Sequence, residues 1–416
     1  MQHRKINFSK YLNIRNVIGI LCNETNTRVQ SMTVMDTVIK DIRLWFSLCG
    51  YLLLTTLCFT FLSTALSQTN SNFNIDLQLD YSAAEQSIAL YEDGFVNTQH
   101  VAEMRGNRIA AYTTGMIENR ESVATQLQCY LDSLKYHQII RADIYNLEAA
   151  RKNVSVIKTL LEELKRRNFS KRVAATVEQI FPSDAQVSIT IPVYVVAFGH
   201  ENVDAYVRRI IWRGDHPWFV GENEGELTIV TNLAHAVDYG LNTEERFISL
   251  LGVVAHEVFH AAFSAYKENS DSWKKFYAEH KQSLDALLDL TQNEGIAYYL
   301  SLEQQGHGFV PRDWNSKSRD LFLTFNANAV QLSSETISNR QAAEIIRKAN
   351  LSGYQDNYGS VVGMFIAREI DIRLGRASLI ETIASTPYEF FRKYIALTKT
   401  DSNLPKIRIP VIEINR

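Results

Sequence analysis

Apolar residues recur every three or four positions through most of the chain, and this spacing predicts a mainly helical protein. From residue 82 to about residue 180 no proline interrupts the pattern, and we expect about four helices there. Further helices are expected at 242–266, 283–305 and 358–374, and the last two are stopped by Gly306 and Gly375.

Two segments in the middle of the chain have the composition of β-strands. Residues 187–198 read VSITIPVYVVAF, which predicts one strand or two short ones broken at Pro192. Residues 226–233 predict another strand, and the residues between the two segments predict turns. Residues 68–80 are polar and rich in Asn and Ser, so we expect a linker. The predicted class is α+β, mostly helical, with a helical N-terminal part, a small central sheet and C-terminal helices.

The first 67 residues differ from the rest. Leu44–Leu66 contains no charged residue, basic residues precede it, and Ala65-Leu66-Ser67 has the small-x-small pattern of a signal-peptidase site. We expect a signal peptide that is cleaved before Gln68. The alternative is an uncleaved anchor, because about 20 apolar residues can span a bilayer. Either reading predicts export from the cytoplasm, to the periplasm, the cell surface or the medium.

These patterns divide the chain into three regions: the leader 1–67, a helical N-terminal region 68–185 and a C-terminal region 186–416. The net charge of −3 argues against nucleic acid as a partner, because phosphate binding needs a concentrated basic face. Outside the leader the only cysteine is Cys129, so no intramolecular disulfide is possible there. We expect Cys129 to be a buried small residue in a helix rather than a nucleophile.

The helix expected after residue 242 contains the sequence His256-Glu257-Val258-Phe259-His260. Residues i and i+4 lie on one helix face, one turn apart, so the two imidazoles can bind one tetrahedral zinc ion. The carboxylate of Glu257 then reaches the water on the metal and takes its proton. The flanking residues are apolar, and unpaired ionisable groups among them would cost several kcal/mol each. We therefore expect one Zn²⁺ per chain.

This motif resembles that of the gluzincins, the thermolysin-like zinc metallopeptidases, whose third ligand is a Glu on a later helix. The context Asn293-Glu294-Gly295-Ile296-Ala297 matches, so the resemblance implies Glu294 as the third ligand. Rival carboxylates by position are Glu268, Glu279, Asp285 and Asp289. The metzincin pattern HExxHxxGxxH is absent, because positions 263 and 266 are Phe and Tyr.

The resemblance covers about residues 190–395 and includes an uncharacterised group of exported bacterial proteins described as zinc-dependent peptidases. It implies a gluzincin core with the active site between the sheet and the helical part. It also implies Tyr358 as an oxyanion stabiliser, with Tyr354 and Tyr299 as weaker candidates and a packing role as the alternative. Tyr298 stands where thermolysin-like members often carry an Asp that orients a zinc histidine, so no partner of the ligands is assigned. For His235 and His307 we expect surface or core roles.

We therefore expect zinc-dependent hydrolysis of a peptide or protein substrate with Glu257 as the general base. One alternative is a metal-dependent hydrolase of another amide or ester, because HExxH describes water activation and not the substrate. Another is a non-catalytic zinc-containing binding protein, although such a protein would not need Glu257. The strand around 193–198 is a candidate edge strand for an extended substrate. Membrane contact is expected only through an uncleaved N-terminal segment.

Overall fold

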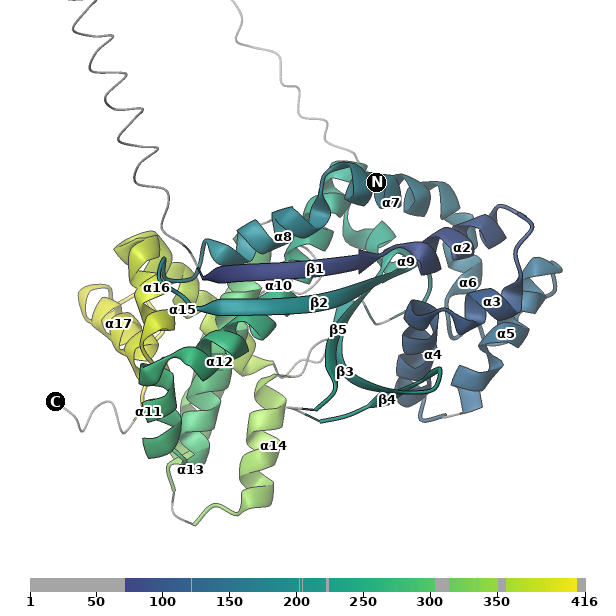
Figure 1. Cartoon of the computed structure of the whole chain (residues 1–416). Coiled ribbons are helices and arrows are strands. Elements are labelled where there is room, and N and C mark those ends of the chain that lie inside the picture. The colour runs from purple at the N-terminus through teal and green to yellow at the C-terminus, as the bar shows by residue number, and fades with distance from the viewer. Residues whose placement is uncertain are drawn as a thin grey trace, which may run out of the picture. The chain divides into compact units, whose positions relative to one another are not determined.

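The computed structural model describes residues 72–120, 122–201, 203, 205–221, 224–303, 314–334, 336–350 and 357–409. Residues from Asn70 onward belong to one compact unit. Its described part is a mixed five-stranded sheet with many helices around it (Figure 1), so the predicted α+β, mostly helical class is confirmed. The leader 1–67 lies outside the described residues, and the boundary between 185 and 186 stays a prediction.

The sheet has the strand order β1-β2-β5-β3-β4. Its strands are β1 (Phe73–Asp80), β2 (Val187–Val196), β3 (Ala205–Arg213), β4 (His216–Phe219) and β5 (Glu226–Asn232). β1, β2 and β5 are parallel, whereas β3 is antiparallel to both β5 and β4. β2 lies inside the sheet between β1 and β5, and most of its side chains are buried.

The linker expected at 68–80 is wrong for most of its length. Phe73, Ile75, Leu77 and Leu79 alternate with polar residues, which is the two-residue period of a strand. β1 pairs with β2 along its whole length, from Phe73 to Asp80. The polar residues of this segment are therefore those whose side chains face outward from the strand.

Pro192 does not divide β2. It lies one residue before the pairing of β2 with β5 begins, so its missing N–H can face a side without a partner strand. The prediction of turns between the two strands was incomplete. That region contains β3 and β4, which form a hairpin around Gly214-Asp215, and Gly214 has a positive φ of 60°.

The N-terminal helical stretch contains more and shorter helices than the four expected. They are α2 (Ser82–Tyr91), α3 (Thr98–Glu103), α4 (Arg105–Ile117), α5 (Ser122–Lys135), α6 (Leu147–Lys152), α7 (Val154–Arg166) and α8 (Phe169–Glu178). Cys129 on α5 is exposed, so the expectation of a buried cysteine is wrong.

The three later helices that the sequence predicts are confirmed as α10 (Thr243–Asn269), α12 (Ser283–Glu303) and α15 (Tyr358–Leu374). Gly375 ends α15 with a φ of 89°, as expected of a helix-stopping glycine, whereas Gly306 lies outside the described residues. The remaining helices are α9 (Leu233–Ala236), the short 3₁₀ helix η1 (Val237–Tyr239), α11 (Asp271–Glu279), α13 (Trp314–Leu332), α14 (Asn339–Ala349), α16 (Arg376–Ala384) and α17 (Pro387–Thr400).

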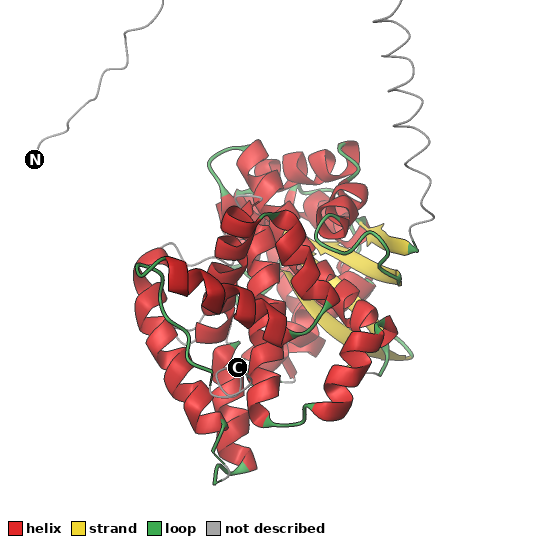
Figure 2. Ribbon diagram, turned by 90° about the vertical axis from the view of Figure 1, so that its left-hand side faces the viewer, coloured by secondary structure: helices red, strands yellow, loops and turns green. Residues whose placement is uncertain are grey.

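Helices gather at both ends of the sheet. Figure 1 shows α2 to α6 at one end and α11 to α17 at the other, and Figure 2, seen from the latter end, shows these C-terminal helices in front of the strands. α10 lies between the two groups, where it packs against β2, α8 and α12. Among the described helices, α10 alone is long and apolar enough to cross a bilayer, but 72% of its apolar window is buried inside the molecule.

The N-terminus of α10 is capped by Asn242, a residue type favoured at that position. The Asn242 side-chain oxygen accepts from the Glu245 backbone N–H at 2.9 Å, and the Asn242 amide donates to the Glu245 carboxylate at 2.8 Å. The same carboxylate accepts from the Leu241 backbone N–H at 2.7 Å. These bonds satisfy backbone donors that every helix start leaves open.

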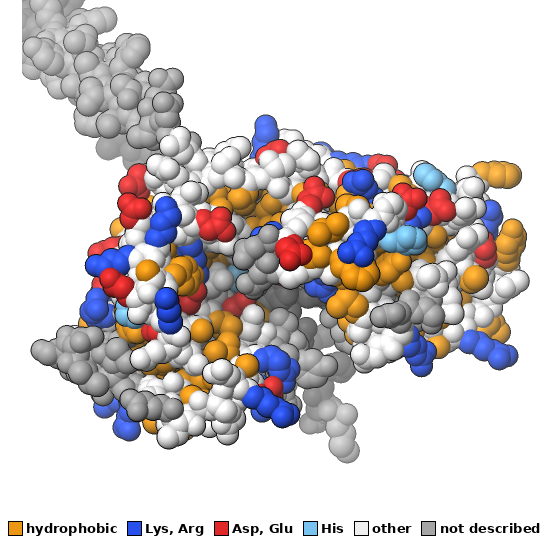
Figure 3. Space-filling view, turned by 60° about the horizontal axis from the view of Figure 1, so that its bottom comes forward, with side chains coloured by type: hydrophobic (Ala, Val, Ile, Leu, Met, Phe, Trp, Pro, Cys, Tyr) orange, Lys and Arg blue, Asp and Glu red, His pale blue; other side chains and the backbone are white. Residues whose placement is uncertain are grey.

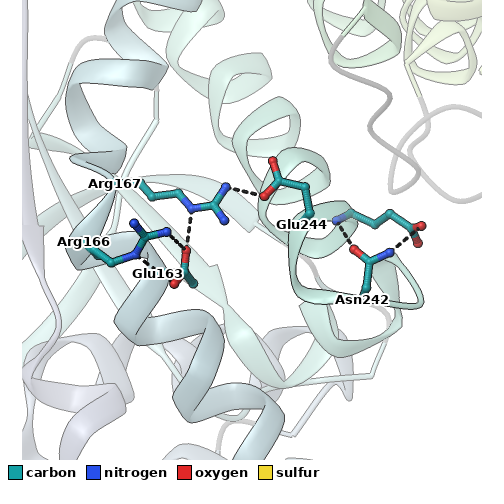
Figure 4. Close-up of polar contacts among 6 residues, drawn as sticks. Glu163, Arg166, Arg167, Asn242 and Glu244 are labelled. Carbon is teal, nitrogen blue, oxygen red and sulfur yellow. Dashed lines mark hydrogen bonds and ion pairs between the residues drawn. The ribbon is translucent and has the colours of Figure 1, made fainter.

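A charged network ties this end of α10 to α7. Figure 4 shows Arg167 between the carboxylates of Glu163 and Glu244, with Arg166 also donating to Glu163. The Arg167 guanidinium also lies 4.6 Å from the centre of the Phe247 ring. The start of α10 is therefore held by a cap and by a network of side chains from a second helix.

Candidate metal centre

α10 and α12 run antiparallel, and contacts along the pair set their register. Ser301 on α12 donates to the Gly252 carbonyl on α10 at 3.0 Å. Two turns further along α10, the His260 ring meets Asn293, and beyond it Lys267 meets Asp289. These contacts bring the face of α10 that bears both motif histidines against the face of α12 that bears Glu294.

Three donor atoms converge between the two helices. The Nε2 atoms of His256 and His260 lie 3.0 Å apart. The Glu294 carboxylate lies 3.8 Å from His256 Nε2 through Oε2 and 3.5 Å from His260 Nε2 through Oε1. In the described part of the chain, this trio is the one cluster of His, Cys, Asp or Glu side chains close enough to hold a metal ion.

The geometry of this donor set fits a zinc ion. Donors about 2.0 Å from a tetrahedral zinc lie about 3.3 Å from one another, which is within the range of the distances found here. The Asn293 side-chain oxygen lies 3.1 Å from His260 Nδ1 and is an acceptor, so Nδ1 carries the proton and Nε2 presents a lone pair. A lone pair 3.0 Å from a second ring nitrogen is stable only with a proton or a cation between them.

Burial favours the neutral form of the first histidine. The His256 side chain is 6% exposed. Its burial lowers the pKa of the imidazole well below the usual value, the neighbouring His260 lowers it further, and a backbone hydrogen bond with Ala297 opposes both. The Tyr298 ring stands edge-on to the His256 ring, with centroids 4.7 Å apart. Neutral imidazole is the form that binds metal.

The carboxylate of Glu294 is also largely buried. Its burial raises the pKa of the carboxyl group, whereas the charge of His260 and a side-chain hydrogen bond with Asn350 lower it. Asn350 follows α14, and its side-chain oxygen lies 3.5 Å from the Ser360 hydroxyl on α15. α14 and α15 thus help to orient a carboxylate that α12 supplies.

Glu257 is half-buried on α10, next to His256. Burial lowers the pKa of Arg208 on β3, whereas Tyr206 and the negative charge of Glu257 raise it, and α10 packs against that strand. Figure 3 shows a hollow in the surface between the C-terminal helices and the part that carries β3 and β4. The general base expected from the sequence therefore lies near a strand of the sheet.

The rival carboxylates have other surroundings. Glu268 and Glu279 are exposed. Asp285 accepts a hydrogen bond from Tyr388 at 2.6 Å, and Asp289 pairs with Lys267. Of the five carboxylates that spacing left open, the structure brings Glu294 to the histidines.

The tyrosines and other histidines lie differently. Tyr358 is 1% exposed, and its hydroxyl donates to the Ile345 carbonyl at 2.9 Å, as a packing tyrosine would. Tyr299 donates to Asp371 at 2.7 Å. The His235 ring packs edge-on against Tyr239. Tyr354 and His307 lie outside the described residues.

The edge-strand prediction for 193–198 is wrong. β2 pairs with β1 as far as Tyr194 and with β5 from Val193 to Val196, and residues 195–198 are buried, so this backbone is not free to bind a peptide. β4 covers only Ile210–Arg213 of β3. In the described part of the sheet, the open edge next to α10 is therefore the first half of β3.

Sequence reasoning missed the partners of the ligands. Asn293 precedes Glu294 directly, and its type and position were a usable signal, because zinc-bound histidines usually donate their second N–H to an oxygen. Nothing in the sequence pointed to Asn350, because only the packing of α14 brings this residue to Glu294. The Asp that Tyr298 replaces is thus not needed to give His260 an acceptor.

Fold and site together define a mostly helical α+β protein with a His-His-Glu cluster fit for a metal ion. The chain belongs to the family described as "Putative zinc dependent peptidase (DUF5700)", whose family model matches residues 95–403. No curated protein and no solved structure shows a significant match to the chain. The matched residues include most of the helical N-terminal region as well as the three residues of the metal cluster.

Proposed function

We propose that this protein is a peptidase of the gluzincin type, in which His256, His260 and Glu294 hold one zinc ion and Glu257 is the general base. The observation that carries the proposal is the convergence of three donor atoms from two antiparallel helices. Membership in a family described as zinc-dependent peptidases supports the same chemistry. Three protein ligands leave the fourth position of a tetrahedral ion open, which is typical of catalytic zinc sites.

A zinc ion in this site would lower the pKa of a bound water toward 7 and polarise the carbonyl group of the substrate. Glu257 accepts the proton of the attacking water on its carboxylate and then donates it to the nitrogen of the leaving amine. Asn293 keeps the proton of His260 on Nδ1, so that Nε2 remains a ligand.

An oxyanion stabiliser is also expected, because negative charge develops on the carbonyl oxygen during the attack. Tyr358 remains our proposed donor for this role. Its hydroxyl would first have to exchange the Ile345 carbonyl for the substrate.

The central experiment compares the full-length wild type with Glu257→Gln for zinc content and for cleavage of a mixed peptide library. We expect about one zinc per chain in both proteins and cleavage by the wild type alone. Glu268→Gln is the matched control, because Glu268 is exposed on the same helix, and it should cleave like the wild type. Zinc in both proteins without any cleavage would favour another amide or ester substrate or a binding protein. Absence of zinc from the wild type would refute the proposal.

We also propose that the protein acts outside the cytoplasm, because of the apolar segment Leu44–Leu66. Cell fractionation with an antibody against the C-terminal region tests this. Recovery of the protein in the cytoplasm would contradict it. Extraction from membranes only by detergent would indicate an uncleaved anchor.

A further inference from the structure

In the described part of the sheet, no strand pairs with the first half of β3 on the side away from β5, and the Arg208 side chain of β3 itself lies along this open edge. β4 pairs with β3 only from Ile210 to Arg213, and the Arg209 carbonyl accepts from the Val220 N–H at 3.0 Å, on the side away from β5. Carbonyl groups two residues apart along a strand point to the same side, so the Val207 carbonyl points away from β5 as the Arg209 carbonyl does. That carbonyl accepts from Arg208 Nη1 at 2.9 Å.

Two aromatic rings hold the Arg208 guanidinium at this edge. Its central carbon lies 4.9 Å from the centre of the Tyr206 ring and 5.6 Å from that of Phe219. Tyr206 and Thr113 of α4 line one small cavity, and the Phe219 ring packs edge-on against Tyr112 of α4. Rings held in place fix the plane of a stacked guanidinium.

The guanidinium lacks an acceptor for part of its hydrogen-bonding capacity. Nε is buried and has no hydrogen-bond partner in the part of the chain that the structure describes. Burial lowers the pKa of Arg208, and the charges of Tyr206 and Glu257 oppose that change. The helix that carries Glu257, α10, packs against β3. A buried cation with a free donor is costly, and a carboxylate relieves this cost best because it accepts two parallel bonds from the guanidinium fork.

We propose that Arg208 binds a carboxylate group of the peptide substrate at the open edge of β3, an inference that rests on the proposed peptidase function. The carboxylate has two possible sources, the C-terminus of the substrate and an acidic side chain. In either case an extended peptide that reaches this edge meets Arg208 on the strand against which α10 packs. The protein then selects peptides that carry a carboxylate.

Binding can be measured without turnover by calorimetry on zinc-loaded full-length protein that carries Glu257→Gln, so that no probe is cut. Every protein compared here carries this change, and the one with Arg208 and Arg209 intact is called the wild type. The probes are an N-acetylated alanine tetrapeptide with a free C-terminal carboxylate, the same peptide amidated, and amidated versions with one Ala replaced by Glu. We expect the wild type to prefer a carboxylate probe about 10- to 100-fold, the usual effect of a charge-assisted hydrogen bond. Preference for the free acid alone identifies the C-terminus, and preference for a Glu peptide identifies an acidic side chain.

Three variants test the assignment. Arg208→Met should bind acid and amide within about twofold of each other, and Arg208→Lys should keep part of the preference, because it retains the charge without the fork. Arg209→Met, on the next residue of the same strand, should keep the full preference. The Arg208→Lys result also stands if Arg208→Met fails to fold.

The outcomes separate this inference from the proposed function. Equal binding of acid and amide by the wild type, or a preference that survives in Arg208→Met, overturns the role of Arg208 even if peptides are cleaved. A preference that depends on Arg208, without cleavage of any peptide, supports Arg208 and overturns the peptidase. Absence of binding by every probe overturns the role of Arg208, whereas the peptidase is decided by zinc content and by cleavage of the mixed peptide library.

Discussion

The contact between Lys267 and Asp289 offers the sharpest test of how the two metal-bearing helices are held together. The side chain of Lys267 is 9% exposed and that of Asp289 is 19% exposed. The ammonium lies 4.2 Å from the centre of the Phe263 ring and 4.4 Å from that of Trp273. The other carboxylate oxygen of Asp289 accepts from the Tyr277 hydroxyl at 2.7 Å.

Lys267→Met removes the charge and keeps an unbranched apolar stem, so little cavity forms. Removal of one partner from a buried ion pair costs about 3–5 kcal/mol. Two cation–π contacts are included in this loss, each worth about 0.5–2 kcal/mol. Because Asp289 keeps its bond with Tyr277 and some solvent, we expect the lower end, about 3 kcal/mol of unfolding free energy.

The assay is urea unfolding of the zinc-free protein, so that metal binding does not mask the change. The double variant Lys267→Met/Asp289→Leu should lie within about 1 kcal/mol of the wild type, because it leaves no unpaired charge. Lys274→Met on α11 is the control, because the Lys274 side chain is 57% exposed, and we expect a change of less than about 0.5 kcal/mol. A loss below 1 kcal/mol in the single variant, or a double variant no more stable than the single, would refute the reasoning.

Three further predictions concern the site and its frame. Asn293→Ala should weaken zinc binding about 10- to 100-fold in a chelator competition, because the proton of His260 loses its acceptor; unchanged affinity would remove Asn293 from the site. Gly363→Ala should destabilise the protein by about 2 kcal/mol in the same urea assay, because the added Cβ would lie 2.0 Å from a carbonyl oxygen of α12. Gly221→Ala is the control and should be neutral, because its added Cβ meets no atom within 4 Å. The pKa of Glu163 is lowered from 4.5 to about 2 by hydrogen bonds from two arginines, so its contribution is complete above pH 4.5 and is lost as the pH falls toward 2. The zinc-free Glu163→Gln variant should therefore show a smaller decrease in Tm between pH 4.5 and 2 than the zinc-free wild type, and an equal decrease would contradict this.

Local periodicity was enough to predict the helices that carry the chemistry. The existence of α10, α12 and α15 follows from apolar spacing, and Gly375 ends α15; both signals act within a few residues of the chain. The placement of His256 and His260 on one face follows from the helical repeat alone. These features need no tertiary contact, so the sequence was a sufficient guide to them.

Tertiary structure decided the rest, because the relevant partners are distant in sequence. Spacing left five carboxylates as possible third ligands, and the antiparallel register of α10 and α12 brings Glu294 to the histidines. The pairing of β1 with β2 turns a polar segment into a strand, and the packing of α14 brings Asn350 to Glu294. The order of strands leaves the first half of β3, with Arg208, as an edge in the described part of the sheet, and α10 packs against that strand. Such contacts depend on how faces of separate elements meet, and a single sequence does not encode this in any local pattern.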